Sequence, residues 1–209
     1  MSEYGYIPEA PEQSFGNNKG IFNPKDIYDL TRSDKYTNYG QLELIETQTV
    51  SSVAQVDFTN LGTYNVHFMT INDMAIATDN QLIDIRFFES GVLESGSVYQ
   101  SAGVLGASTG SFSEERSTSA TFYRWTGGIG NATNETGNGY CYFYNLIDSS
   151  KYSFLTSHTQ FQNSSNVSHT YFGSGVLPQA SEVSGIRILS NSGNIDNADI
   201  SLYGIKEYS

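Results

Sequence analysis

The residue types that most often carry chemistry are few in this sequence. It holds three histidines, His67, His158 and His169, and one cysteine, Cys141. No two histidines stand at a spacing typical of zinc sites, and two of them fall inside segments expected to be strands, so we expect structural histidines. Cys141 lies in the aromatic run of residues 140–144, which favours a small buried hydrophobic side chain, and a lone cysteine excludes an intramolecular disulfide.

Carboxylates offer a second kind of chemistry, because a glycoside hydrolase needs two of them about 5–10 Å apart, one with a raised pKa. Asp84 stands two residues before Arg86 in an expected strand, which places both on one face and predicts a surface or cross-strand ion pair. Glu114 and Glu115 neighbour Arg116 in an expected loop and are predicted to be solvated. None of these residues has the pattern of an acid paired with a nucleophile.

The sequence gives little support for a nucleotide site, a serine nucleophile or a calcium site. The run Gly127-Gly-Ile-Gly130 is as glycine-rich as a phosphate-binding loop, but neither a helix start nor a Lys-Ser/Thr pair follows it. Serine is abundant without a G-x-S-x-G motif. The oxygen-rich segments 72–73 and 194–199 suit calcium, although neither matches a calcium-binding loop. We expect no enzymatic activity, no cofactor and no metal centre, with calcium binding as a minor alternative.

Composition and charge narrow the function classes further. The chain has 209 residues, of which 22 are acidic and 10 basic, which gives a formal net charge of −12. A negative field of this size repels phosphate backbones, so nucleic-acid binding is disfavoured. No apolar run approaches the ~20 residues of a membrane span, and the N-terminus lacks the basic and apolar parts of a signal peptide. We expect synthesis in a cytoplasm and no membrane insertion.

The first 40 residues differ from the rest of the chain. They contain three of the four prolines and only scattered apolar residues, which predicts an extended arm over residues 1–40. One short helix is expected at Pro24–Thr31, with Asn23 as its N-cap and Asp26 in its first turn. Such an arm buries too little apolar area to order itself and needs a surface to lie on. That surface is its own domain, a neighbouring subunit or another protein.

From residue 41 to residue 209 the sequence reads as strands separated by turns, and it predicts one β domain. Tyr, Phe and Thr are common there, alternation with period two recurs, and no segment of ten residues has helical periodicity. With no helices to make crossovers, we predict an antiparallel, jelly-roll-like β-sandwich. Segments 101–117, 127–139 and 162–168 are expected to be loops. Strands are expected at 41–50, 53–58, 64–72, 82–89, 97–100, 118–126, 140–147, 152–162, 168–173, 184–190 and 198–205.

One stretch of the chain points towards ligand binding. Tyr123 and Trp125 share a face of the expected strand that includes Thr121, and exposed aromatic rings of this kind stack on sugars. They are therefore candidate glycan-binding residues. Core packing explains the same pattern equally well, and the sequence does not decide which face of this strand is buried.

Seven segments along the chain form a recognisable pattern: residues 8–11 (PEAP), 17–24 (NNKGIFNP), 39–50 (YGQLELIETQTV), 56–60 (VDFTN), 64–68 (YNVHF), 185–188 (GIRI) and 201–205 (SLYGI). Together they resemble small structural proteins from the virions of marine tailed bacteriophages and the β-domains of related tail fibres. The resemblance implies a capsid decoration protein, a head fibre or a short tail fibre, without enzymatic activity.

The resemblance also implies where the chain is found and what it contacts. Its partners would be other virion proteins of the capsid or tail, it would be a homotrimer, and it would be assembled into virions in the host cytoplasm. The alternative function is a carbohydrate-binding adhesin module that uses loops and aromatic residues of the sandwich to recognise a host-surface glycan. An enzyme acting on glycans is a third hypothesis. The expected anchoring residues in the arm are Pro8, Pro11, Phe15, Ile21, Phe22 and Pro24.

Overall fold

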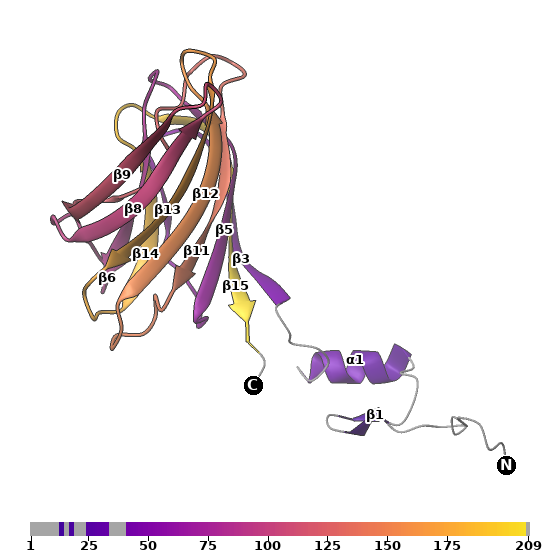
Figure 1. Cartoon of the computed structure of the whole chain (residues 1–209). Helices are drawn as coiled ribbons and strands as arrows, with labels where there is room; N and C mark the ends of the chain where they lie inside the picture. Colours follow the sequence, from indigo (N-terminus) through magenta and orange to yellow (C-terminus); the bar gives the residue numbers. More distant parts are fainter. Residues whose placement is uncertain (1–12, 15–16, 19–23, 34–40, 208–209) are drawn as a thin grey trace. The chain divides into compact units, whose positions relative to one another are not determined.

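The computed structural model describes residues 13–14, 17–18, 24–33 and 41–207, and most of these residues lie in β-strands (Figure 1). The chain divides into two compact units, one of residues 1–41 with 206–209 and one of residues 42–205. The strands of the larger unit and its ends are β3 Gln41–Val53, β4 Gln55–Phe58, β5 Val66–Ile76, β6 Ile83–Glu89, β7 Val92–Leu93, β8 Tyr99–Ala107, β9 Phe112–Ala120, β10 Tyr123–Arg124, β11 Gly137–Tyr144, β12 Ser153–Gln162, β13 Ser168–Leu177, β14 Val183–Ser190 and β15 Ile195–Lys206.

The N-terminal unit contains the expected helix. Strands β1 (Gln13–Ser14) and β2 (Asn17–Asn18) pair antiparallel, and α1 spans Pro24–Arg32. Proline suits the first helical position because that N–H has no partner within a helix. Lys25 Nζ lies 2.7 Å from Asp29 Oδ2 one turn later, an ion pair that favours the helix slightly. Of the expected anchoring residues, Pro24 begins α1, and Pro8, Pro11, Phe15, Ile21 and Phe22 lie outside the described residues.

The larger unit is a sandwich of two antiparallel sheets, as predicted from the sequence. One sheet has eight strands in the order β3-β15-β5-β11-β12-β13-β8-β9, and Figure 1 shows them side by side. The other has the order β10-β6-β14-β4, with β7 paired to β6. Strands β11, β12, β13, β8 and β9 pair over long stretches, so this half of the large sheet forms a continuous surface.

The core follows from the alternation of apolar side chains along the strands. Ile83, Ile85 and Phe87 of β6 were expected to share a face, and all three are buried between the sheets. Cys141 and Phe143 of β11 are buried opposite them in the large sheet, so the expected burial of the cysteine is confirmed. The side chains at the alternate positions of β11 therefore point away from the core.

The segment 101–117, expected to be a loop, is instead most of a hairpin formed by β8 and β9. Its Gly, Ser and Ala residues have low strand propensity, but tertiary packing requires small side chains here. A Cβ on Gly103 would lie 2.6 Å from Tyr171 Cζ and 2.7 Å from the Phe172 carbonyl oxygen. Small residues thus let β8 approach β13. The segments 127–139 and 162–168 are mostly loop and turn, ending at β11 and β13.

Candidate functional site

The predicted glycan-binding role of Tyr123 and Trp125 is wrong, because both side chains are in the core. They are 1% and 0% exposed, and the Tyr123 hydroxyl lies 2.9 Å from Ser157 Oγ of β12. Burial raises the pKa of the Tyr123 hydroxyl. Gly173 of β13 makes room for the ring, since a Cβ there would lie 2.5 Å from the Tyr123 oxygen. The sequence did not decide which face of this strand is buried. In the structure, the side chains of Tyr123 and Trp125 are the ones that point into the core.

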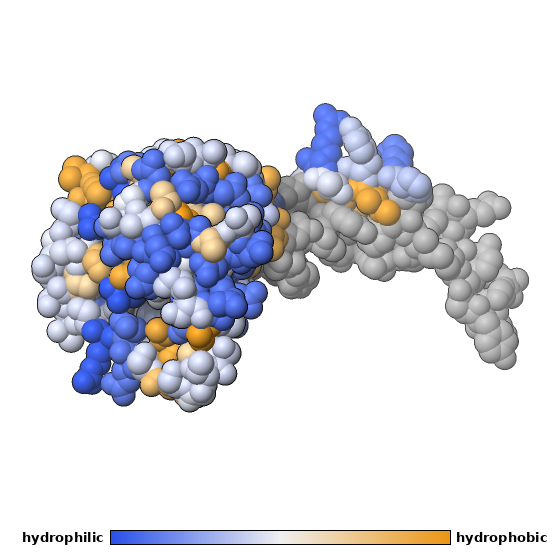
Figure 2. All heavy atoms as spheres, turned by 90° about the horizontal axis from the view of Figure 1, so that it is seen from above, coloured by the Kyte–Doolittle hydropathy of each residue, from blue (hydrophilic) through white to orange (hydrophobic). Residues whose placement is uncertain are grey.

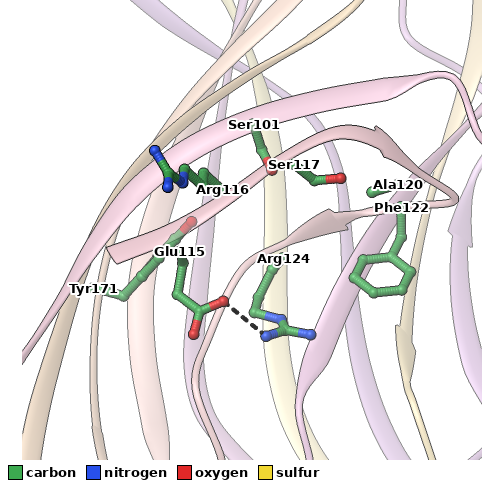
Figure 3. A pocket seen from close by; sticks show the side chains of 8 residues that line it. All are labelled: Ser101, Glu115, Arg116, Ser117, Ala120, Phe122, Arg124 and Tyr171. Atoms are coloured by element: carbon green, nitrogen blue, oxygen red, sulfur yellow. Dashed lines mark hydrogen bonds and ion pairs between the residues drawn. The ribbon is translucent and has the colours of Figure 1, made fainter. Parts of the chain in front are cut away.

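A polar cleft lies at the edge of the sandwich beside β9 and β10, and we call it the edge cleft (Figure 3). Its volume is about 220 Å³. Arg124 of β10 and Glu115 of β9 meet across it, with Nη1 and Oε2 3.0 Å apart, while Arg116 points away from this pair. Glu115 was expected to be solvated in a loop and is instead half-buried and ion-paired. The cleft is lined by Ser101, Glu115, Arg116, Ser117, Ala120, Phe122, Arg124 and Tyr171.

Asp84 stands directly opposite Arg124 in the pairing of β6 with β10. The sequence predicted a surface or cross-strand ion pair for Asp84, which it placed on one face with Arg86, but Asp84 is buried, with only 2% of its surface exposed. Burial raises the pKa of Asp84 to about 7, and the nearby charges of Arg124 and Arg86 oppose this rise. Its Oδ1 is buried without a hydrogen-bond partner among the described residues. Since Asp84 is not part of the cleft lining, the edge cleft presents one carboxylate, Glu115, which is already paired.

A pair of carboxylates that sequence reasoning missed lies at the end of β6. Glu89 accepts a hydrogen bond from Ser181 Oγ, and Glu94 Oε1 accepts one from the Gly96 N–H at 2.6 Å. The amide nitrogen of Gln179, oriented as a donor, lies 2.7 Å from Glu89 Oε2 and 3.2 Å from Glu94 Oε2. Burial raises the pKa of Glu89, whereas the hydrogen bond from Gly96 lowers that of Glu94. Hydrogen-bond donors from two loops therefore bind the oxygens of both carboxylates.

The most extensive unassigned feature is the outward side of the large sheet. Aromatic side chains gather there on five adjacent strands, and several are well exposed, with Phe172 at 52%, Phe154 at 43% and Tyr140 at 39%. We call this surface the aromatic face. It comprises Tyr203 of β15, Phe68 of β5, Tyr140, Tyr142 and Tyr144 of β11, Phe154 and His158 of β12, and Phe172 of β13.

Strand register places the rings of the aromatic face in contact across the sheet. Phe68 lies opposite Tyr142, with ring centroids 4.8 Å apart, and its ring is 6.2 Å from that of Tyr203. His158 lies opposite Phe172 and stacks on it, with centroids 4.1 Å apart and planes 16° from parallel. Pairs in such contact hold each other's orientation, because offset-stacked and edge-to-face geometries are preferred. The aromatic face is therefore a preformed array of rings.

An open trough adjoins the aromatic face where β8, β9, β12 and β13 run side by side. Its volume is about 420 Å³, within the usual range of ligand sites. Phe154 provides an aromatic wall, and Gln100, Thr156 and Ser174 contribute amide and hydroxyl groups. Within the described chain, the side chains of Gln100 and Ser174 form no hydrogen bond. The trough thus combines one ring with polar groups that still have capacity to bind.

The three histidines do not converge in the fold. His67 is buried, with Nε2 2.7 Å from the Leu61 carbonyl oxygen, and burial lowers its pKa. His158 Nε2 lies 3.1 Å from Thr170 Oγ1, and His169 Nδ1 lies 3.1 Å from the Val167 carbonyl oxygen. Each has a local partner, which fits the expected structural role. Among residues 13–14, 17–18, 24–33 and 41–207, no group of three or more His, Cys, Asp or Glu could hold a metal ion.

Comparison with known proteins adds no relative: no family model, no curated protein and no solved structure matches this chain. The resemblance to virion proteins therefore stays a prediction. Within the described residues, no helix has the length and apolar character needed to cross a membrane. Functional inference accordingly rests on the surfaces of the sandwich itself.

Proposed function

We propose that this chain is a non-enzymatic structural protein of a bacteriophage particle, attached through its N-terminal arm. The observation that carries the proposal is the division of the chain into two compact units, of which residues 42–205 contain a large hydrophobic core. A unit with its own core can be displayed while a separate segment provides attachment. The arm and sandwich design suits a capsid decoration protein, a head fibre or a short tail fibre.

The chemistry of the described sandwich supports this role. Its edge cleft offers a single ion-paired carboxylate, and the donors of two loops satisfy the Glu89–Glu94 pair. Cys141 is buried, and burial raises the pKa of its thiol, which disfavours the nucleophilic thiolate. These features suit a protein that assembles or binds rather than one that turns over a substrate.

The charge of the chain also supports display on a particle. With a formal net charge of −12, copies on neighbouring particles repel one another, which opposes aggregation. The partners in this proposal are capsid or tail proteins. Virion proteins commonly repeat with symmetry, and the symmetric assembly proposed here is a homotrimer.

The proposal is tested by examining particles of the phage that carries the gene. Particles are purified on a density gradient, and their proteins are identified and counted by quantitative mass spectrometry. The expected result is this chain in the particle band, with a copy number divisible by three. A chain that is abundant in the infected-cell lysate but absent from the particle band would overturn the proposal.

A further inference from the structure

We propose that the aromatic face is a binding site for a neutral carbohydrate chain, with Tyr140 and Phe172 as central stacking residues. This inference is independent of the virion proposal, because a sandwich can bind glycans wherever it is displayed. Tyr123 and Trp125, the residues predicted from the sequence, are buried. The stacking residues proposed here lie on the opposite side of the large sheet.

Ring geometry is the first argument. The aromatic face crosses five adjacent strands, and at about 4.8 Å between strands it extends roughly 20 Å, enough for several sugar rings in a row. The C–H bonds on one side of a pyranose carry slightly positive hydrogens, which complement the negative face of an aromatic ring. Because the rings already contact one another, little side-chain entropy is lost when a ligand stacks on them.

Charge is the second argument, and it selects a neutral ligand. Three of the five strands of the aromatic face, β11, β12 and β13, contain no Asp, Glu, Lys or Arg, in a chain that has 32 such residues. The other two strands carry Asp73 on β5 and Asp196, Asp199 and Lys206 on β15. A sheet that presents aromatic rings can also stack nucleotide bases, but that mode requires basic side chains along the backbone path. No Lys or Arg lies on β5, β11, β12 or β13, and the net charge of −12 opposes phosphate.

Polar groups beside the rings are the third argument. Gln160 of β12 and Ser174 of β13 are exposed, and within the described residues their side chains form no hydrogen bond. The trough next to Phe154 adds the amide of Gln100 and the hydroxyl of Thr156. Sugars need both a stacking surface and uncharged hydroxyl or amide partners. Figure 2 shows that, seen from above, apolar residues on the sandwich occur in small separate groups among polar ones.

The test uses the full chain and an array of immobilised neutral and anionic glycans, followed by titration calorimetry with the strongest neutral oligosaccharide. Phe172→Ala and Tyr140→Ala are each expected to weaken binding about tenfold, because each removes one stacking ring. Tyr140→Phe keeps the ring and is expected to change the Kd less than about threefold. Tyr28→Ala, which removes an exposed ring from α1, is the matched control and is expected to leave binding unchanged.

Folding of each variant is checked by urea unfolding. The substituted side chains are exposed, so each variant is expected to keep the native fold. Sedimentation velocity is measured in parallel, because a second copy of the chain is the competing occupant of this face. The proposal is overturned if the chain binds no neutral glycan, or if Phe172→Ala and Tyr140→Ala leave the affinity unchanged. It is equally overturned if Phe172→Ala changes the oligomeric state, since the face is then buried between subunits. Particle association, measured separately, can succeed or fail without affecting this result.

Discussion

Because the carboxyl of Asp84 is buried, the protein is expected to lose stability as the pH rises from about 4 to about 7. Asp84 is 2% exposed, and burial raises its pKa from an ordinary value of 3.8 to about 7. Between pH 4 and 7 the folded protein therefore binds more protons at this site than the unfolded chain does, and stability falls as the pH rises. Above about pH 7 the contribution of Asp84 is constant.

The substitution Asp84→Asn removes this titration while keeping the shape of the side chain. The difference between about 7 and 3.8, at about 1.4 kcal/mol for each pH unit, amounts to at most about 4 kcal/mol. At pH 4 the variant and the natural protein should have similar free energies of unfolding. At pH 8 the variant should be more stable, by an amount that grows through pH 4 to 7 and then levels off.

Urea unfolding followed by fluorescence measures this difference, because Trp125 is the only tryptophan and is fully buried. Comparing the variant with the natural protein at each pH cancels the titration of all other groups. A stability difference that stays constant from pH 4 to 8 would refute the raised pKa. A variant less stable than the natural protein at pH 8 would show that attraction to Arg124 and Arg86 exceeds the cost of burial.

Three further substitutions or treatments test other parts of the fold. Arg187 donates two hydrogen bonds to Asp57, at 2.6 and 2.7 Å. Asp57→Asn removes the negative charge and one of the two accepting oxygens, and should lower the free energy of unfolding by about 2 kcal/mol; an unchanged urea midpoint would contradict this. Gly103→Ala should cost about 1–3 kcal/mol, because its Cβ meets Tyr171 and Phe172; a neutral effect in the same assay would show that β8 moves freely. Cys141 should react with a thiol reagent only in urea, because it is buried; rapid labelling of the native chain would contradict its place in the core.

Alternation predicted the sheets well, because it depends only on chain geometry. Ile83, Ile85 and Phe87 share the buried face of β6 as expected, and the helix starting at Pro24 follows from its local signals. The β8–β9 hairpin was missed because its small residues have low strand propensity, and only packing against Tyr171 shows why they are needed.

The candidate site was less predictable, because alternation shows which residues share a face but not which face is buried. On β11 both faces carry apolar side chains, and the core takes Cys141 and Phe143 rather than the tyrosines. On β10 the core takes Tyr123, and this choice depends on glycines of β13, about 50 residues later in the chain. The burial of Asp84 likewise depends on tertiary packing, which period-two alternation on one strand does not reveal.

The proposed attachment of the sandwich to a particle through its arm is tested by co-sedimentation with purified phage particles that lack this protein. The full chain and a shortened chain of residues 41–209 are compared, after urea unfolding shows that the shortened chain keeps its folded sandwich. The full chain is expected to sediment with the particles, and the shortened chain is expected to stay in solution. Equal sedimentation of both chains, or of neither, would contradict it.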